Sequence, residues 1–210
     1  TITDLRRNAV ITETVCKGLA QAPTIKHLTV VSSDAVYSSR DSFVSEATTP
    51  APDSLHGVMN LSREIACNQI GIDKVMTVRP TGVYGPGDTH NSYGPNRFAR
   101  QILQQEPIQI FGRGFGIRDH VYVGDVGGIL LDVVKNQGIG TRNAVSGESV
   151  TFRDLAEMMR SRFPNESSIA YVGEESKPTV RYYERESLSL VTNAATTTSL
   201  VEGLRLLMSE

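Results

Sequence analysis

Two short apolar runs on either side of a long helical pattern constrain the fold of this chain most. Residues 27–33 and 74–80 are rich in β-formers and almost continuously apolar. Strands of this kind are typical of a parallel sheet that is covered on both faces. The pattern between them predicts a helix over residues 52–71, with Pro near its start and Gly at its end. The order strand, helix, strand predicts an α/β fold.

The rest of the chain contains further helical and strand patterns around one irregular segment. After Pro80 the sequence turns to Gly, Pro, Asn and Tyr as far as residue 96, which predicts an ordered loop of the kind that often carries function. Asp125 is expected to be a helix N-cap. The remaining predicted elements are helices over residues 4–20, 97–105 and 125–136, a strand over residues 108–111, and capped helix starts at Thr151 and Ser199.

Composition excludes several functional classes. The chain has 21 Lys and Arg against 23 Asp and Glu, so it lacks the positive surplus of a nucleic-acid-binding protein. No apolar run approaches the roughly 18 residues of a membrane span, and we expect no membrane association and no metal site. Cys16 and Cys67 are the only cysteines and lie in helical patterns. We expect them to be small core residues in a reducing compartment such as the cytoplasm.

Two polar segments follow predicted strands. Ser32, Ser33 and Asp34 end the first strand, where ligands of open α/β sheets bind. A turn whose side chains satisfy backbone donors explains them equally well. The second segment runs from Arg79 into a Gly/Pro turn, where glycines would let a ligand approach the backbone, although a simple tight turn is the better explanation when it is taken alone.

Two more segments carry charged or titratable side chains. Residues 108–126 place Arg113 and Arg118 among glycines before a helix, which suits an anionic ligand. A glycine-rich hairpin with solvated arginines is an equal alternative. His56 and Asn60 lie four residues apart in a predicted helix and therefore share one face. A lone His on a helix is usually structural.

Taken together and in this order, the four segments resemble the extended short-chain dehydrogenase/reductase family, specifically its NAD-dependent nucleotide-sugar epimerases and dehydratases. The Arg-Pro-x-x-Val-Tyr-Gly-Pro motif is intact over residues 79–86, and Gly-x-Gly-x-x-x-Arg-Asp-x-Val-Tyr-Val-x-Asp-Val is intact over residues 112–126. The Ser-Ser-x-x-Val-Tyr-Gly strand end is matched from Ser32 except for its last residue, which is Ser38. The resemblance implies a partial doubly wound, Rossmann-type parallel sheet with a small α/β substrate lobe.

The resemblance also implies a division of the chain into two lobes. Residues 1–85 and 118–145 would form the later part of the NAD-binding domain. Residues 86–117 and 146–210 would be mainly a discontinuous substrate-binding lobe, with a closing helix over residues 199–210 and a stretch at 187–198 that is shorter than in the family. The Gly-rich dinucleotide fingerprint does not occur in these 210 residues. We expect earlier strands to lie elsewhere, since the sheet edge would otherwise be unpaired, and we expect weak binding of NAD or NADP by this chain alone.

Family motifs assign roles to individual residues. By resemblance, Ser33 would hydrogen-bond the reacting carbon's oxygen and Arg118 would hold the diphosphate, at opposite ends of one cleft. Lys177 would replace a second diphosphate-binding Arg, with Arg181 as a nearby alternative. The implied catalytic residues are Ser33, Asp34, His56 and Asn60; the implied cofactor contacts are Ser32, Asn60, Arg79 and Pro80; the implied substrate contacts are Asn96, Arg97, Arg118, Lys177 and Arg181.

The most important departure from the family is its catalytic Tyr-x-x-x-Lys, which is replaced here by His56 and Asn60. A tyrosine with a pKa near ~10 needs a neighbouring cation to act as a base, whereas an imidazole with a pKa near ~6.5 does not. One hypothesis is an active NAD(P)-dependent nucleotide-sugar epimerase or reductase in which His56 is the acid/base. The alternative is an impaired member that binds a nucleoside diphosphate sugar or a protein partner without turnover.

Two further expectations rest on family analogy. Dehydratases of this family tend to place Asp-Glu after the hydroxyl residue, whereas Asp34 is followed by Ala35. Epimerisation or carbonyl reduction is therefore preferred over dehydration. Family members often dimerise through two long helices, and we expect a homodimer in which residues 4–20 and 52–70 form a four-helix bundle.

Overall fold

The protein is described here as a computed structural model, which covers residues 1–89, 91–163, 167–174, 177–184 and 197–209. The stretch at residues 187–198, predicted to be short for the family, lies outside these residues except for its last two. No helix in the described ranges is both long enough and apolar enough to cross a membrane.

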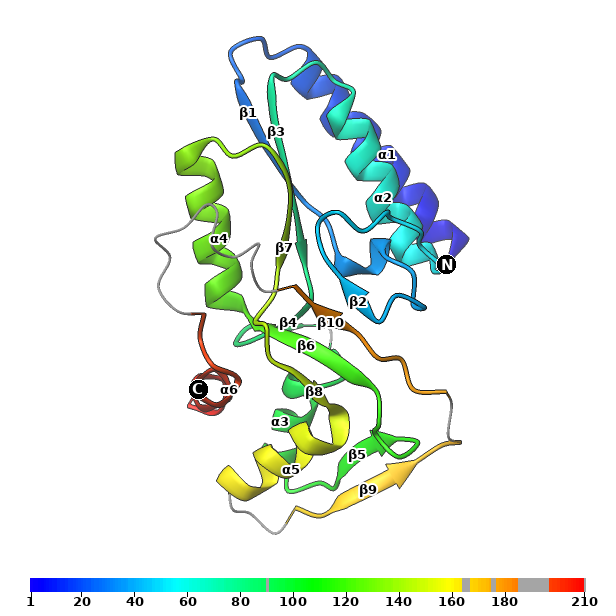
Figure 1. Cartoon of the computed structure of the whole chain (residues 1–210), viewed down its shortest axis with the longest axis vertical. Helices are drawn as coiled ribbons and strands as arrows, with labels where there is room; N and C mark the ends of the chain where they lie inside the picture. Colours follow the sequence, from blue (N-terminus) through cyan, green and yellow to red (C-terminus); the bar gives the residue numbers. More distant parts are fainter. Residues whose placement is uncertain (90, 164–166, 175–176, 185–196, 210) are drawn as a thin grey trace.

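A three-stranded parallel sheet forms one end of the molecule (Figure 1). Its strand order is β1 (His27–Val31), β3 (Lys74–Pro80) and β7 (Gly140–Ala144). The prediction for β3 is confirmed over its whole length, and β1 ends two residues earlier than predicted. Val78 at the centre of β3 is fully buried, as expected for a sheet covered on both faces.

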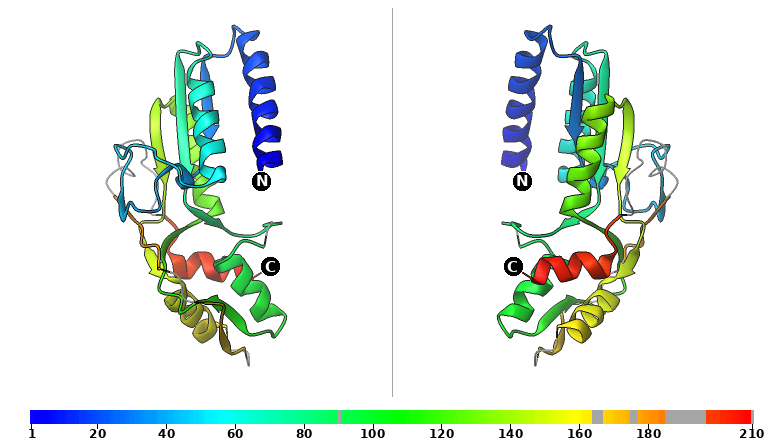
Figure 2. Two further views of the ribbon diagram at one scale, coloured as in Figure 1. Left: turned by 90° about the vertical axis from the view of Figure 1, so that its right-hand side faces the viewer. Right: turned by 90° about the vertical axis from the view of Figure 1, so that its left-hand side faces the viewer.

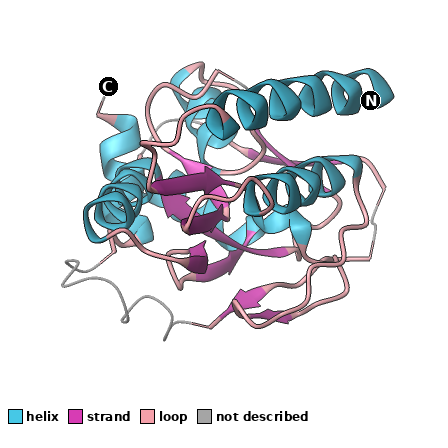
Figure 3. Cartoon of the chain, turned by 90° about the horizontal axis from the view of Figure 1, so that it is seen from above, coloured by secondary structure: helices cyan, strands magenta, loops and turns pink. Residues whose placement is uncertain are grey.

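Helices cover both faces of this sheet. Figure 1 shows α4 (Val123–Asn136) on one side and α2 (Leu55–Asn68) with α1 (Ile2–Ala20) on the other. The α2 helix begins three residues after the predicted Pro52, because the Ser54 hydroxyl accepts a hydrogen bond from the Gly57 amide and caps it. Helix α1 packs along α2, buries none of its own residues, and lies at an outer edge of the molecule (Figure 3).

The start of α4 corrects the prediction for Asp125. Tyr122 is the N-cap residue of α4, and Asp125 lies in its first turn. The Asp125 carboxylate instead accepts hydrogen bonds from the Thr198 amide (2.9 Å) and the Thr198 hydroxyl (2.7 Å). The Asp125 carboxylate therefore binds a residue far along the chain instead of capping the helix as the local sequence pattern predicted.

The rest of the described chain forms short strands, one short 3₁₀ helix that packs against α2, and three α-helices at the other end of the molecule (Figure 1). Parallel pairing joins β4 to β6, β5 to β9, and β2 to β10, whereas β6 and β8 are antiparallel. The capped starts predicted at Thr151 and Ser199 are both confirmed. The elements are η1 (Asp34–Val36), β2 (Phe43–Val44), β4 (Gly82–Tyr84), α3 (Pro95–Leu103), β5 (Ile108–Phe111), β6 (Ile117–Tyr122), β8 (Ser149–Thr151), α5 (Phe152–Arg162), β9 (Ile169–Val172), β10 (Tyr182–Tyr183) and α6 (Leu200–Met208).

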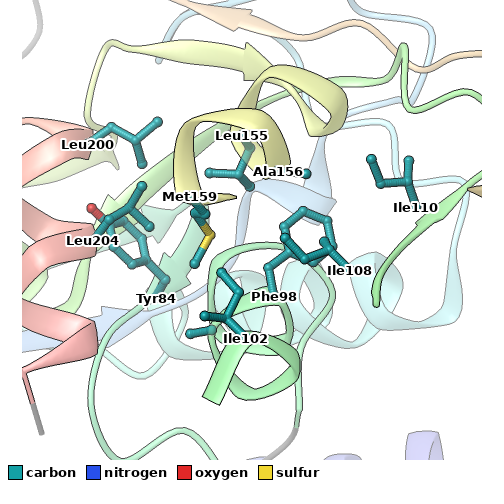
Figure 4. Packing of buried hydrophobic residues seen from close by; sticks show 11 residues of the cluster. Tyr84, Phe98, Ile102, Ile108, Ile110, Leu155, Ala156, Met159, Leu200 and Leu204 are labelled. Atoms are coloured by element: carbon teal, nitrogen blue, oxygen red, sulfur yellow. The ribbon is translucent and has the colours of Figure 1, made fainter. Parts of the chain in front are cut away.

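The largest hydrophobic cluster lies between these helices and strands. Figure 2 shows α3, α5 and α6 gathered at the end of the molecule away from the central sheet. Their apolar side chains meet those of β4 and β5 in one hydrophobic core (Figure 4). Its members include Tyr84, Phe98, Ile102, Ile108, Ile110, Leu155, Ala156, Met159, Leu200 and Leu204.

The two cysteines are free thiols. Cys67 is buried, as predicted, whereas Cys16 is only half-buried. Burial, and secondarily the neighbouring Cys16 thiol, raises the pKa of Cys67 to about 11. Cys67 is therefore protonated at neutral pH.

Close packing of α6 on β4 gives a test of this core. The Tyr84 hydroxyl is buried without a partner in the described part of the chain, and a Cβ on Gly203 would lie 1.9 Å from it. We expect Gly203→Ala to lower the free energy of unfolding by about 1–3 kcal/mol through overpacking. The cost should be smaller in a Tyr84→Phe background, measured by urea unfolding. Gly127→Ala on α4, where a Cβ meets nothing within 4 Å, is the matched control; an equal cost in both backgrounds contradicts the packing argument.

Candidate functional site

The segment that follows β1 folds against the first turn of α2. Ser33 is half-buried, and its hydroxyl accepts a hydrogen bond from the Ala35 amide (3.1 Å), which caps η1. A Cβ at position 57 would lie only 2.1 Å from the Ala35 carbonyl oxygen. Glycine at 57 therefore allows the helix turn that carries His56 to meet the segment that carries Ser33.

His56 and Asn60 share one face of α2, as their spacing predicted. The Asn60 side-chain amide donates to the His56 carbonyl oxygen (2.9 Å), and the same nitrogen lies 3.3 Å from His56 Nε2. His56 is exposed and Asn60 is buried. Asn60 can orient the imidazole by hydrogen bonding, but it brings no positive charge.

Beneath this surface lies a buried ion pair. Arg79 on β3 donates to both carboxylate oxygens of Glu64 on α2, at 2.9 Å from Nε and 2.6 Å from Nη2. Ser32 also donates to Glu64, and Arg79 donates to the Tyr37 hydroxyl (2.9 Å). Tyr37 in turn donates to Asn143 (2.7 Å) on β7. Ser32 and Arg79, which we predicted to contact a cofactor, thus have their side chains engaged inside the protein, and the neighbouring Pro80 is buried at the end of β3.

Two cavities lie between β6 and the elements around it. Cavity A, of about 250 Å³, is lined by Asp34, Thr81, Gly82, Val83, Tyr84, Ser92, Tyr93, Pro95, Asn96, Arg118, Asp119, His120 and Phe152. Cavity B, of about 170 Å³, is lined by Tyr93, Phe111, Gly112, Arg113, Gly114, Phe115, Gly116, Arg118, Phe152, Lys177, Pro178 and Thr179. Arg118 is common to both cavities. Among the predicted catalytic residues, Asp34 lines cavity A, whereas Ser33, His56 and Asn60 line neither.

Arg118 has an unusual electrostatic environment. Its guanidinium donates to two backbone carbonyls, of Ile117 (3.0 Å) and Thr179 (3.2 Å). Within the described residues no carboxylate lies at ion-pair distance from it. Burial and then the charge of Arg181 lower the pKa of Arg118. The nearby Asp34 carboxylate acts in the opposite direction but is not at ion-pair distance from Arg118, so the guanidinium can still pair with an anion.

Arg181 is engaged differently from Arg118. It is buried, and its Nη1 lies 3.3 Å from the Asp34 carboxylate, while its Nη2 donates to the Ser38 carbonyl (2.6 Å). The Tyr183 hydroxyl also donates to the Asp34 carboxylate (2.6 Å). Strand β10 thereby holds η1 in place. Arg181, the alternative diphosphate contact, lines neither cavity. No sequence motif indicated that Tyr183 would bind the Asp34 carboxylate.

Of the three remaining predicted substrate contacts, Asn96 and Lys177 line the cavities, whereas Arg97 lines neither. Asn96 is buried in cavity A and accepts from the Gly85 amide (3.1 Å). Arg97 donates to Gln109 (3.0 Å) and lies 5.3 Å from the ring centre of Phe111, a residue of cavity B. Lys177 is exposed at cavity B. No group of three or more potential metal ligands occurs in the part of the chain that the structure describes.

Sequence reasoning missed His120. It is 4% exposed and lines cavity A. Burial, followed by the charge of Arg118, lowers the pKa of His120 to about 4. Because alternate strand residues share a face, the spacing from Arg118 could have indicated it.

Comparisons with known proteins place these features in a family context. The model of the NAD dependent epimerase/dehydratase family matches residues 2–144. YtcB of Bacillus subtilis (strain 168), named an uncharacterized UDP-glucose epimerase, is 33% identical over 129 residues. That match covers 59% of this chain but only 40% of YtcB, so the chain spans about two fifths of this relative.

Solved structures confirm the predicted Rossmann-type α/β fold. MoeE5 in complex with UDP-glucose and NAD has a TM-score of 0.84 at 26% identity, over 96% of this chain and 70% of that chain. The UDP-glucose 4-epimerase of Thermotoga maritima with UDP-glucose has a TM-score of 0.86 at 22% identity, over 99% of this chain and 70% of that chain. The second likeness concerns the fold alone.

The buried ion pair gives a test of what holds the site together. We expect Glu64→Ala to cost about 3–5 kcal/mol in urea unfolding, because it leaves the Arg79 charge buried and unpaired. Replacing both partners, as Glu64→Leu with Arg79→Met, should cost less than the sum of the two single changes. Glu157→Ala breaks an exposed pair with Arg160 (2.7 Å) and should cost about 0–1 kcal/mol. Equal effects at positions 64 and 157 would show that the buried pair is not a structural anchor.

Proposed function

Because this chain belongs to the NAD dependent epimerase/dehydratase family, we propose that it binds a nucleoside diphosphate sugar for NAD-dependent epimerisation or carbonyl reduction of the sugar. MoeE5 was solved with UDP-glucose and NAD, and YtcB is named a UDP-glucose epimerase. A uridine diphosphate sugar is therefore the first ligand to test. Since the chain spans about two fifths of YtcB, the activity of the whole protein is part of the proposal.

The observation that carries this proposal is the position of Arg118. Its half-buried guanidinium lines both cavities and has no carboxylate partner at ion-pair distance among the described residues. A diphosphate bound there would place the sugar in cavity A, toward Asp34, and the nucleoside in cavity B. Exposed Lys177 would add a second positive charge at cavity B.

We assign the two lobes accordingly. Residues 86–117 and 146–210 form mainly the substrate-binding lobe, and residues 1–85 and 118–145 form the later part of the NAD-binding domain. In support, cavity B is lined mostly by residues of the first group, while the central sheet is drawn from the second. Both cysteines are free thiols, which fits a cytoplasmic location.

The residues present fit NAD only in part. The 210 residues lack the Gly-rich turn of the family, and the side chains of Ser32 and Arg79 bind Glu64. We therefore propose weak binding of NAD or NADP by this chain alone. When bound, the nicotinamide supplies the site that takes up and returns a hydride.

Proton transfer is the part of the chemistry assigned to this chain. Ser33 hydrogen-bonds the oxygen at the reacting carbon, and a ring nitrogen of His56 accepts the hydroxyl proton, which an imidazole can do at neutral pH without a neighbouring cation. Asn60 orients the ring. Asp34 is paired with Arg181 and is followed by Ala35 instead of a second acid, so epimerisation or reduction is preferred over dehydration.

Binding without turnover is the second candidate function. Two observations favour it: His56 is exposed, and neither His56 nor Ser33 lines cavity A or cavity B. In this case Arg118 would still hold the ligand, while the proton-transfer group would be absent.

We also propose that the protein forms a homodimer through α1 and α2. Helix α1 buries none of its own residues and exposes Val10 and Ile11, and α2 exposes Val58 and Ile65. A groove of about 420 Å³ lies between the two helices. Packing of a second copy would cover this apolar surface.

A binding measurement tests the role of Arg118. We expect the 210-residue chain to bind UDP-glucose in titration calorimetry, and Arg118→Ala to weaken this binding at least about tenfold through loss of a charge-assisted contact. Arg205→Ala removes an exposed arginine on α6 that is paired with Glu202, and should leave the affinity unchanged. Equal affinities of wild type and Arg118→Ala would refute the assignment of the diphosphate to this residue.

Restoring the family's catalytic pair separates the two candidate functions. The experiment uses a form of the protein that binds NAD. In it we expect the double change His56→Tyr with Asn60→Lys to lower the rate of UDP-glucose epimerisation about 10²- to 10⁴-fold, because the proposal makes His56 the acid/base. Ligand affinity serves as the control and should not change. A large gain of activity, or no turnover by the wild type, would favour binding without catalysis.

A further inference from the structure

Cavity A contains a polar side chain that the proposed function leaves without a role. His120 lines this cavity, and its Nε2 atom is buried without a hydrogen-bond partner in the described residues. Its ring lies edge-on to Phe152, with 5.7 Å between the ring centres. A buried polar atom without a partner costs free energy, and such groups are rare in folded proteins.

The backbones of two glycines pack close to the other edge of the imidazole. A Cβ on Gly82 would approach Nδ1 to 3.0 Å, and a Cβ on Gly94 would approach Cε1 to 3.1 Å. Gly82, Tyr93 and Pro95 all contribute to the cavity wall. Nε2 is buried without a partner, whereas Nδ1 is not such an atom and lies next to Gly82, which lines cavity A, so Nδ1 is the ring nitrogen on the cavity side.

The environment of the ring selects its tautomer. A proton on Nε2 would leave a buried N–H without an acceptor, which is rarer in proteins than an acceptor without a donor. Placing the proton on Nδ1 leaves only the Nε2 lone pair unsatisfied and points a donor at the cavity. With a pKa of about 4, set by burial and then by Arg118, the ring is neutral at pH 7.

Strand alternation places this donor beside Arg118. Residues 118 and 120 are two apart on β6 and so point to the same face, with their backbones about 7 Å apart. Asp119, between them, also lines cavity A, but its carboxylate is engaged: it accepts from the Thr81 hydroxyl (2.7 Å) and the Ser146 amide (2.9 Å). An anion bound by Arg118 would therefore lie within reach of the His120 ring.

We infer that His120 is a second phosphate-positioning residue of cavity A, whose Nδ1–H donates a hydrogen bond to an oxygen of the phosphate held by Arg118. This inference rests on the proposed function, since it takes a nucleoside diphosphate sugar as the ligand. A guanidinium alone lets a diphosphate turn about the ion pair. A second donor on the same strand face fixes its orientation, and with it the direction in which the sugar enters the cavity.

Titrations of the 210-residue chain with UDP-glucose and with uridine test the inference. His120→Phe keeps a flat ring against Phe152 but removes the donor. We expect about tenfold weaker binding of UDP-glucose, with the affinity for uridine unchanged because uridine carries no phosphate. His120→Gln restores a donor and should recover part of the affinity. Urea unfolding of each variant verifies that the fold is retained.

A spectroscopic readout adds a test that a purely structural role of the ring would not meet. Nitrogen-15 NMR of the imidazoles should show His120 as the Nδ1–H tautomer, with a shift of Nδ1 on addition of UDP-glucose. His27 lies on β1 of the central sheet, with its Nε2 2.9 Å from the Gly138 carbonyl oxygen, and its nitrogen signals should not shift when UDP-glucose is added. The Nε2–H tautomer, or a His120→Phe variant that binds UDP-glucose as tightly as wild type, overturns the inference.

The outcomes separate this inference from the proposed function. If Arg118→Ala loses UDP-glucose while His120→Phe retains it, the diphosphate site stands and His120 has no part in it. If His120→Phe loses uridine and UDP-glucose equally, the ring shapes the cavity and the inference is wrong. If the wild-type chain binds no UDP-glucose at all, the proposed function fails, and the inference fails with it.

Discussion

The buried ion pair between Glu64 and Arg79 is the interaction on which the rest of this structure depends. It joins α2 to β3 directly, reaches the residue after β1 through Ser32, and reaches β7 through Tyr37 and Asn143. Removing two charges from water is costly, and here at least four hydrogen bonds offset that cost. By fixing α2 on the sheet, the pair sets the close approach of Gly57 to Ala35. The positions of Ser33 and His56 follow from that approach.

The second constraint is that, of two arginines near Asp34, only Arg181 forms an ion pair with it. Arg181 is paired with Asp34, which also accepts a hydrogen bond from Tyr183. Arg118 has only backbone carbonyls as partners, and burial together with the charge of Arg181 lowers its pKa. Because Asp34 is engaged by Arg181, it forms no ion pair with Arg118 among the described residues. The electrostatic environment of Arg118 is therefore set by the cluster of Asp34, Arg181 and Tyr183.

The sequence allowed prediction of features that are decided locally. Periodicity placed β3 correctly, and the hydroxyl caps at Thr151 and Ser199 were found from their spacing. Local pattern failed at Asp125, whose carboxylate binds the distant Thr198 instead of capping the helix. The buried pairing of Arg79 with Glu64 was not predicted, because it joins residues on different elements. Asn96 and Arg118, which the motif resemblance named as substrate contacts, both line cavity A. The role of β10 could not be predicted, because the pairing of two-residue strands far apart in the chain leaves no periodic signal.

The scaffold and the catalytic positions are under different physical constraints in this chain. Gly57 is fixed by the Ala35 carbonyl and Glu64 by Arg79, so both residues are required for α2 to pack. His56 and Asn60, on the same helix, make side-chain hydrogen bonds in the described structure only with each other. The exposed His56 side chain can therefore change without loss of the fold, whereas a replacement of the buried Asn60 must also fit its surroundings. Arg118 lies on β6 and not on α2, so the residue that we propose for ligand binding and those that we propose for proton transfer stand on separate elements.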